Sequence, residues 1–196
     1  MINLESVKQA LLKRGYEAKI CTRDEAVREV LVAVDAIGVN GSVGWGGSET
    51  LKELGLPAAI KAKGCEIRDH RVDCELFLLS ANALTADGRI VNIDGTGNRV
   101  AASIYGPKRV IYLIGSNKLV EGGIDEAIGR IRREACPPNC RRLGKRTPCA
   151  TSKCPWFENG QGCDSPDRIC KATVVFERPP TRTPTTVLLL DGNFGY

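Results

Sequence analysis

The chain has 196 residues, of which 42% are hydrophobic and 26% are charged, and its formal net charge is +5 at pH 7. This length and composition are typical of a single globular domain and argue against a disordered or fibrous chain. No apolar run approaches the roughly twenty residues that cross a bilayer, so we do not expect a membrane span.

The first third of the chain predicts three helices that alternate with short strands. Thr22 and Glu25 stand at the spacing of a capping box, which marks the start of the second helix. The first helix has apolar residues on one face and ends at Gly15, and the third begins at Ser48, a residue suited to capping. The expected helices cover residues 3–15, 22–37 and 48–55, and the expected strands cover residues 16–21 and 39–44.

The next part of the chain contains continuous apolar runs, which indicate strands covered on both faces. Asp87 and Gly88 between two of these runs predict a hairpin turn. Strands alternating with helices favour an α/β fold with three layers around a mostly parallel sheet, to which the hairpin adds one antiparallel pair. The expected strands cover residues 74–80, 89–94, 109–115, 172–177 and 186–190, and the expected helices cover residues 96–105 and 124–133.

Six of the nine cysteines lie in one stretch, and they are Cys136, Cys140, Cys149, Cys154, Cys163 and Cys170. Thiolates are preferred ligands of zinc and of iron–sulfur clusters. Disulfides are the alternative, and we expect them less because the chain begins without an apolar secretory segment. The stretch lacks aliphatic periodicity, so we expect an irregular segment whose order depends on its ligand.

Basic residues flank these cysteines. Such a run can offset the negative charge of a thiolate-bound centre or bind phosphate, whereas a solvated face without a specific role is the alternative. We do not expect nucleic-acid binding, because aromatic residues make up only 5% of the chain and no reading motif accompanies the charges. The basic residues are Arg130, Arg132, Arg133, Arg141, Arg142, Lys145, Arg146 and Lys153.

A glycine-rich loop, VGWGGSET, lies between an expected strand and an expected helix. Backbone amides of Gly46, Gly47 and Ser48 can approach a phosphate or carboxylate closely there, and a loop that only turns tightly is the alternative. The loop is not a dinucleotide fingerprint, because Glu49 replaces the third glycine, and it is not a Walker sequence, because no Gly-Lys-Ser/Thr is present.

A second group of polar residues follows the expected hairpin. Ligands of open α/β sheets collect at the carboxyl ends of strands, where Asp94 and Arg99 should lie. We take Arg99 as the candidate anion clamp and Asp94 as a candidate base or hydroxyl acceptor, the two candidate catalytic residues. The further candidate ligand-binding residues in this part of the chain are Asn82, Gly95, Thr96, Gly97 and Asn98.

These motifs together resemble the LUD-domain family, the lactate utilization proteins. The resemblance rests on VGWGGSETLKELG, on LLSANALTADGRIVNIDGTGNRVAASIYGPKRVIYLIG and on TPCA and SPDRIC, and it covers nearly the whole chain. It implies a fold similar to the sugar-phosphate isomerase and CoA-transferase superfamily, whose glycine loop holds phosphate. Gly46, Gly47, Ser48 and Thr50 match that loop.

In the cysteine-containing subgroup that the chain resembles, four cysteines correspond by position to Cys149, Cys154, Cys163 and Cys170. The resemblance implies that these four bind a metal centre. Wide, uneven spacing with a Cys-Pro pair is more typical of [4Fe–4S] clusters than of zinc, which is the alternative. Eight residues separate Cys154 from Cys163 where similar sequences have a close pair, but a longer loop adds little to the entropy of closure. Cys136 and Cys140 are spare ligands, packing residues or part of a second site.

Other chemically notable residues are expected to be structural. Cys21, Cys65 and Cys74 lie in or beside apolar strands, where buried free thiols are common. His70 is the single histidine of the sequence, which excludes a two-histidine metal site within one chain. Trp45 is either a lid on the glycine loop or a core aromatic.

We therefore expect one LUD-type domain over residues 1–196 with a cysteine-rich, metal- or cluster-binding insertion at 136–171. The expected function is a redox role in lactate or related 2-hydroxy-acid utilization, with a small anionic ligand in the pocket. The alternatives are an isomerase- or transferase-like enzyme acting on a phosphorylated or CoA-type ligand with a structural metal, and a non-catalytic subunit of an electron-transfer complex. We expect protein partners in such a complex and a cytoplasmic location, and a homo-oligomer stays open.

Overall fold

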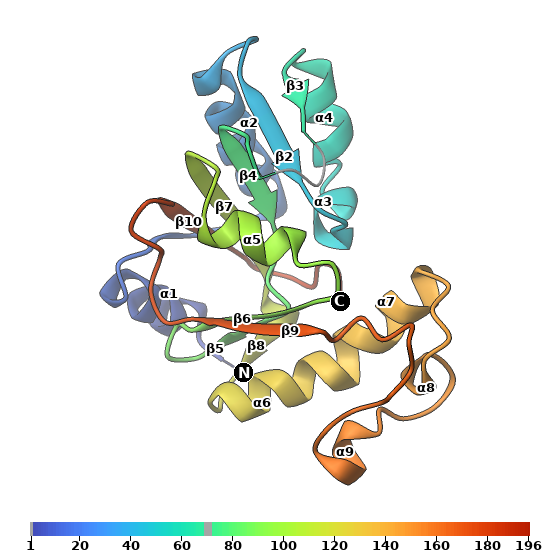
Figure 1. Cartoon of the computed structure of the whole chain (residues 1–196). Coiled ribbons are helices and arrows are strands. Elements are labelled where there is room, and N and C mark those ends of the chain that lie inside the picture. The colour runs from blue at the N-terminus through green and yellow to red at the C-terminus, as the bar shows by residue number, and fades with distance from the viewer. Residues whose placement is uncertain (1, 69–71) are drawn as a thin grey trace.

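The computed structural model describes residues 2–68 and 72–196 and contains two β-sheets (Figure 1). The larger sheet is parallel throughout its six strands. The smaller sheet is mixed, because β6 pairs antiparallel with both of its neighbours while β5 and β8 are parallel. In spatial order the larger sheet consists of β1 (Glu17–Cys21), β10 (Thr185–Leu190), β7 (Arg109–Gly115), β4 (Leu76–Leu79), β2 (Ser42–Trp45) and β3 (Glu66–Ile67), and the smaller of β8 (Leu119–Val120), β5 (Ala83–Thr85), β6 (Ile90–Asp94) and β9 (Ala172–Phe176).

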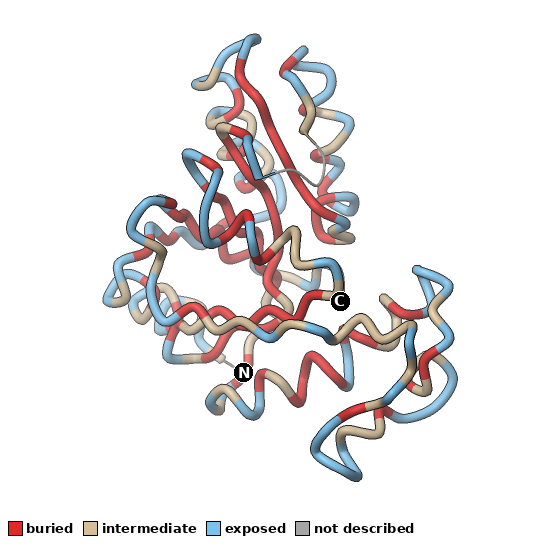
Figure 2. Tube along the Cα trace, viewed as in Figure 1, coloured by how far each residue is buried: buried red, intermediate tan, exposed pale blue. Residues whose placement is uncertain are grey.

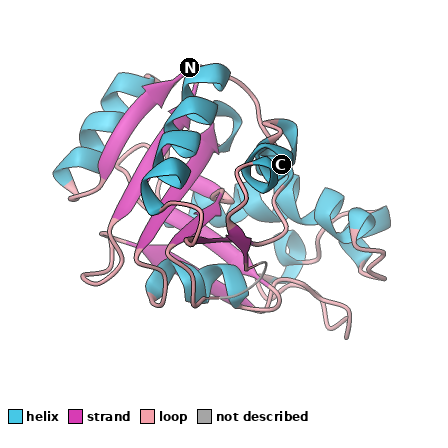
Figure 3. Ribbon diagram, turned by 90° about the horizontal axis from the view of Figure 1, so that it is seen from above, coloured by secondary structure: helices cyan, strands magenta, loops and turns pink. Residues whose placement is uncertain are grey.

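Helices cover one face of the larger sheet, and helices together with the smaller sheet cover the other. Val30, Leu78 and Leu113 belong to the core on the first face, and Leu79 and Leu84 belong to the core on the second. Figure 2 shows that the strands of the larger sheet are mostly buried. Seen from above, helices flank the strands on both sides (Figure 3). The first face packs against α2 (Arg23–Ile37), α3 (Glu49–Glu53) and α4 (Leu56–Ala62), and the second against α1 (Leu4–Lys13), α5 (Asn98–Ile104) and the smaller sheet.

A run of consecutive helical segments covers the outer face of the smaller sheet. Alternate residues of the β5–β6 hairpin face opposite ways, so that Leu84 joins the core toward the larger sheet while Ala83 and Val91 pack with Ile131. The run consists of α6 (Ile124–Arg130), the π-helical turn η2 (Ile131–Ala135) and α7 (Cys136–Arg142), and it follows η1 (Ser116–Lys118) and β8. The predicted three-layer α/β architecture is confirmed, and the hairpin belongs to a second sheet that the sequence did not indicate.

Local capping signals set the helix starts as predicted. The Asn3 side chain accepts hydrogen bonds from the backbone amides of Glu5 and Ser6 at the start of α1. Thr22 and Glu25 form the expected capping box at α2, and Ser48 caps α3. These contacts satisfy amides that lack partners within the helix, which explains why short sequence motifs located them.

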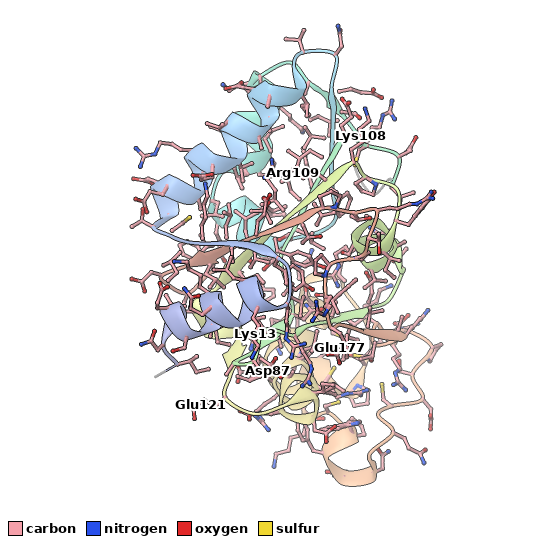
Figure 4. All side chains as sticks on the ribbon, turned by 90° about the vertical axis from the view of Figure 1, so that its left-hand side faces the viewer. Lys13, Asp87, Lys108, Arg109, Glu121 and Glu177 are labelled. Carbon is pink, nitrogen blue, oxygen red and sulfur yellow. The ribbon has the colours of Figure 1, made fainter. Side chains whose placement is uncertain are left out.

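Ion pairs tie α1 to the smaller sheet. Arg14, the residue that follows α1, lies 2.9 Å from Asp87 in the β5–β6 turn and 3.2 Å from Glu177 after β9. Asp87 and Glu177 both lie near the end of α1 (Figure 4). Arg89 pairs with the same two carboxylates. The charges of this face are thus used to hold structural elements together.

The structure differs from the sequence-based expectation in the cysteine segment. Residues 136–170 were expected to be irregular, but they begin with α7 and contain two short helices, α8 (Pro148–Thr151) and α9 (Trp156–Asn159). Proline is compatible with α7 because Pro137 and Pro138 occupy its first turn, where the backbone N–H has no intrahelical partner to bond. Figure 1 shows α8 and α9 projecting from the end of the smaller sheet.

Four further expectations concern the strand at 39–44, Trp45, His70 and a membrane span. The strand expected at 39–44 is β2, which starts at Ser42 because a turn joins Gly38 and Gly41. Trp45 is a core aromatic that is 9% exposed. His70 lies outside the described residues, and within residues 2–68 and 72–196 no helix has the length and apolar character needed to cross a membrane.

Candidate functional site

A cavity of about 470 Å³ lies between the glycine loop, the ends of β4 and β6, and the cysteine segment. Parallel strands converge on such sites at their carboxyl ends, as expected for an α/β sheet. Of the predicted ligand-binding residues, Gly46 and Gly97 are outside its lining. Those that line it are Gly47, Ser48, Thr50, Asn82, Gly95, Thr96 and Asn98, together with Asp94 and Arg99.

Gly46 has a packing role that the sequence did not reveal. A Cβ atom on this residue would lie 2.6 Å from Cγ of Arg99, closer than real Cβ contacts, and 3.1 Å from its Cδ. Arg99 therefore crosses directly over the glycine loop. Its guanidinium donates to the carbonyl of Ile93 at 3.0 Å and lies 3.5 Å from Asp94. The absence of a side chain at Gly46 thus positions the candidate anion clamp.

The Asp94 carboxylate is held at the start of α5. It accepts hydrogen bonds from the backbone amides of Thr96, Gly97 and Val100 at 3.1, 3.0 and 3.4 Å. Burial acts to raise the pKa of Asp94, but the Arg99 charge and these amides outweigh it and hold the pKa below its usual value. An ionised carboxylate with this many donors is better suited to positioning Arg99 and α5 than to accepting a proton.

Asn82, which lies between β4 and β5, is hydrogen-bonded to β6 of the smaller sheet and to α6. Its side-chain oxygen accepts from the Ile93 amide at 3.0 Å, and its amide donates to the side chain of Asn92 at 2.9 Å. Its carbonyl accepts a 2.7 Å hydrogen bond from buried Arg130. These contacts give Asn82 a structural task beside the cavity.

Lys118 is a candidate site residue that the sequence analysis did not single out. It ends η1, directly after β7, and it is 3% exposed while lining the cavity. Its Nζ donates to Thr50 Oγ1 and to Ser80 Oγ, both at 2.8 Å. Burial, assisted by the charges of Arg130 and Arg99, lowers the pKa of Lys118 to about 7. The signal was the polar SNK sequence after the buried strand RVIYLIG, the same rule that located Asp94.

The cavity has an excess of positive charge. The three acidic residues in its lining each pair with arginine: Glu49 with Arg142 at 3.3 Å, Asp94 with Arg99 at 3.5 Å, and Asp167 with Arg146 at 3.6 Å. An anion is therefore the ligand that this lining favours. The basic residues of the lining are Arg99, Lys118, Arg142, Lys145, Arg168 and Lys171.

The cysteine segment forms one wall of this cavity. Cys136, on α7, is part of the lining, and Ile169 packs so closely on Gly95 that a Cβ atom there would lie 3.0 Å from the Ile169 carbonyl oxygen. Arg142 on α7 pairs with Glu49 next to the glycine loop. The thiols and the anion-favouring cavity are thus neighbours.

The thiols of the cysteine segment form two Sγ–Sγ contacts, and three of the cysteines pack in one buried cluster. The Sγ atoms of Cys136 and Cys170 are 3.1 Å apart, and those of Cys140 and Cys149 are 3.7 Å apart. These distances exceed the roughly 2.05 Å of a disulfide bond. Cys154 packs with Cys140 and Cys149 under Trp156 and Ile169.

The structure brings the predicted metal ligands together only in part. Cys149 and Cys154 pack in one cluster, and Cys170 contacts Cys136. The backbone carbonyl of Cys163 accepts a hydrogen bond from Arg168 at 3.1 Å. Across the described ranges 2–68 and 72–196, no three Cys, His, Asp or Glu side chains are placed as ligands of one metal ion. Cys136 and Cys140, whose role the sequence left open, each contact one predicted ligand: Cys136 contacts Cys170, and Cys140 contacts Cys149.

The surroundings of the thiols fit an anionic centre. Arg132 is 8% exposed, lies 5.2 Å from the ring centre of Trp156, and has no hydrogen-bond partner for its Nε among the described residues. Contact with the Cys136 thiol lowers the pKa of Cys170, and the charges of Arg132 and Arg168 lower it further. A buried guanidinium with an unsatisfied donor beside soft thiolate ligands suits a negatively charged thiolate-bound group.

Solved structures support the fold. The crystal structure of a DUF162 family protein from Deinococcus radiodurans matches 95% of this chain and 95% of that chain, with a TM-score of 0.55 and 14% sequence identity. Ribose 5-phosphate isomerase from Plasmodium falciparum matches 50% of this chain and 55% of that chain, with a TM-score of 0.27 and 12% identity, which is too weak to support an inference.

Searching the curated proteins returns no match to this chain. The LUD domain, in contrast, matches residues 4–190, which is almost the full length and includes both sheets, the cavity and the cysteine segment. This protein therefore belongs to the LUD-domain family.

Proposed function

We propose that this LUD-domain protein binds an iron–sulfur cluster and has a redox role in lactate or related 2-hydroxy-acid utilization. One observation carries the proposal: Cys136, whose Sγ is 3.1 Å from that of Cys170, lines the same cavity as Arg99 and Lys118. A redox centre and a binding site for an organic anion would then be adjacent, as electron exchange with that anion requires. The family's link to lactate utilization supplies the substrate class.

The proposed cluster ligands are Cys149, Cys154, Cys163 and Cys170. When bound, a [4Fe–4S] cluster supplies one-electron transfer. Cys140 contacts Cys149 and is the first competing donor. Arg168 orients two of the proposed ligands, because it donates to the carbonyl of Cys170 at 2.8 Å and to that of Cys163 at 3.1 Å.

The proposed pocket ligand is a 2-hydroxy or 2-oxo acid. Arg99 and Arg142 present guanidinium groups to the cavity from α5 and α7, and a carboxylate pairs with such groups through two parallel hydrogen bonds. The backbone at Gly47 and Ser48 lines the same cavity, and a Cβ atom on Gly47 would lie 3.9 Å from a terminal guanidinium nitrogen of Arg142. A volume of about 470 Å³ falls within the usual range for small-molecule sites and also admits acids larger than lactate.

Anaerobic purification with iron, zinc and acid-labile sulfide analysis tests the cluster. We expect brown protein with iron and sulfide in equal amounts and an absorption spectrum that bleaches on reduction. Cys149→Ser should remove most of the iron, whereas the matched control Cys21→Ser should keep it, because Cys21 is buried in the core on the far face of the larger sheet. Colourless protein containing zinc alone, even after anaerobic reconstitution, would contradict the proposal.

Two further variants identify the ligand set. If the ligands are those proposed, Cys163→Ser loses iron and Cys140→Ser retains it. The reverse result would assign the centre to the thiols that already contact each other. Arg99→Ala then separates an enzyme from a docking subunit: lost turnover with intact complex formation supports an enzyme, and lost complex formation supports a non-catalytic subunit.

A further inference from the structure

Lys118 places a buried amine against the cavity with two of its hydrogen-bond directions already used. Nζ donates to the hydroxyls of Thr50 and Ser80. Both hydroxyls direct their own protons to backbone carbonyls, Thr50 to Phe194 at 3.1 Å and Ser80 to Ala81 at 3.4 Å. The hydroxyl oxygens therefore act as acceptors for the amine. One position on Nζ remains, a third N–H if the group is charged or a lone pair if it is neutral.

The charges around Lys118 favour the neutral amine. The charges of Arg130 and Arg99 lower the pKa of Lys118, and the charge of Glu53 raises it. In the described part of the chain, no carboxylate forms an ion pair with Nζ. Together with burial, this explains a pKa of about 7 for Lys118, far below that of an exposed lysine. The neutral amine is therefore much more accessible near neutral pH than that of an exposed lysine.

The chain segment after β10 closes one side of the amine. Gly195 has a φ of +62°, and a Cβ atom there would lie 2.5 Å from Thr50 Oγ1 and 3.3 Å from Lys118 Nζ. The backbone thus packs directly over the Lys118–Thr50 pair. Since Lys118 is 3% exposed and lines the cavity, a small molecule reaches Nζ through the cavity.

From this geometry we propose that the Lys118 amine forms an imine with the carbonyl carbon of a small 2-oxo acid whose carboxylate is held by the basic lining of the cavity. The inference rests on the proposed anion pocket and extends it to covalent chemistry, but it does not require the cluster. Neutral lysines in desolvated pockets beside other cations are the ones that react in this way.

The reaction balances without a redox partner. The Nζ lone pair adds to the carbonyl carbon, one N–H proton is transferred to the carbonyl oxygen, and the resulting carbinolamine loses water to leave a C=N bond. The hydroxyls of Thr50 and Ser80, 2.8 Å from Nζ, hold the amine in place during addition. Hydrolysis of the imine returns the free amine and the 2-oxo acid.

Borohydride trapping tests the inference on the purified full chain. Pyruvate is the probe, because sodium borohydride reduces its imine to a stable secondary amine that peptide mass spectrometry locates. We expect the adduct on Lys118 and not on Lys108, an exposed control lysine on the surface. Methyl pyruvate, which lacks the carboxylate, should label about tenfold less, because the charged hydrogen bonds to the lining are lost. Labelling of Lys118 should increase as the pH rises through about 7.

Lys118→Met has an unbranched, uncharged side chain that resembles the neutral lysine in length but has no amine, so it should abolish trapping while its circular dichroism matches the wild type. If that variant does not fold, acetic anhydride labelling of the wild-type protein at several pH values reports the basicity of Lys118 directly. The inference is overturned if pyruvate and borohydride leave Lys118 of the folded protein unlabelled, or if acetic anhydride labels Lys118 no faster than Lys108.

The cluster and imine experiments have independent outcomes. Trapping on Lys118 in protein without iron and sulfide would retain the inference and remove the proposed redox function. Protein that contains the cluster but forms no adduct would remove the inference alone.

Discussion

Replacing Asp94 by asparagine tests whether its charge, and not merely its shape, organises the mouth of the cavity. Asp94 is 5% exposed, accepts from the amides of Thr96, Gly97 and Val100, and lies 3.5 Å from Arg99. Asparagine keeps the size of the side chain and one acceptor oxygen. It leaves the Arg99 guanidinium without its carboxylate, and its NH₂ group faces one of the former donors.

The expected cost follows from these contacts. Hydrogen bonds to a charged group contribute roughly 1.5–3 kcal/mol each and neutral ones about 1 kcal/mol, so loss of the charge should destabilise the fold by about 2–3 kcal/mol. For a chain of this size, 1 kcal/mol shifts the melting temperature by roughly 2–4 °C. We therefore expect Asp94→Asn to melt roughly 4–12 °C below the wild type.

The pH dependence gives the sharper test. The folded-state pKa of Asp94 lies below its ordinary value of 3.8, so the folded protein favours the ionised carboxylate. The stabilisation is therefore fully present above about pH 5 and is lost as the pH falls below about 4, toward the folded-state pKa. Urea unfolding of both proteins between neutral and acidic pH should show a difference in unfolding free energy that shrinks on acidification.

A surface carboxylate provides the control. Asp24 is 83% exposed in its side chain and pairs with Arg23 at 3.4 Å, so Asp24→Asn should leave stability unchanged within error. If the Asp94→Asn difference is absent at pH 7, or is the same at pH 7 and at the acidic end, then the charge of Asp94 does not organise this site.

Other substitutions test the packing that joins the loop, the helix and the cysteine segment. Gly46→Ala should lower stability by about 1–3 kcal/mol and weaken the binding of an anion such as pyruvate, because the new methyl group displaces Arg99. An unchanged pyruvate affinity in a calorimetric titration would contradict this prediction. In Gly95→Ala the new methyl group lies against the Ile169 backbone, so we expect a lower iron content after reconstitution and a modest loss of thermal stability. An unchanged iron content would refute the close packing of the cysteine segment on Gly95. Arg132→Met removes a buried, unsatisfied donor, so the metal-free variant should be no less stable than the metal-free wild type. After reconstitution, the variant should contain less iron than the wild type. A large loss of stability in the metal-free variant would show that Arg132 has a structural partner.

Much of the fold was predictable because its signals are local. The Thr22–Glu25 capping box and the Asn3 cap act within three residues of the chain, and both helix starts were located from sequence. The continuous apolar run of residues 109–115 became β7 with the expected bounds. The helix α4 was missed because it follows α3 after a short turn and adds few signals of its own.

The site was predictable where it depends on the ends of strands. Asp94 and Arg99 were located from the end of an expected strand, and Gly47 and Ser48 from the glycine loop before an expected helix. All four line one cavity, although β6, which ends at Asp94, is antiparallel to both of its neighbours. The same rule applies to Lys118, but a lysine in a polar sequence looks exposed until the segments that bury it are known.

The sequence by itself determined the identity of the chemical groups: six clustered thiols, a glycine loop, and polar residues after buried strands, because composition and short-range spacing depend on neighbouring residues. The tertiary structure decided which of these groups meet. Cys136 and Cys170 are 34 residues apart, and Lys118 and Thr50 are 68 residues apart, yet each pair is in contact. Such contacts, and the desolvation that lowers the pKa of Lys118, arise when distant segments pack together, and no local pattern encodes them.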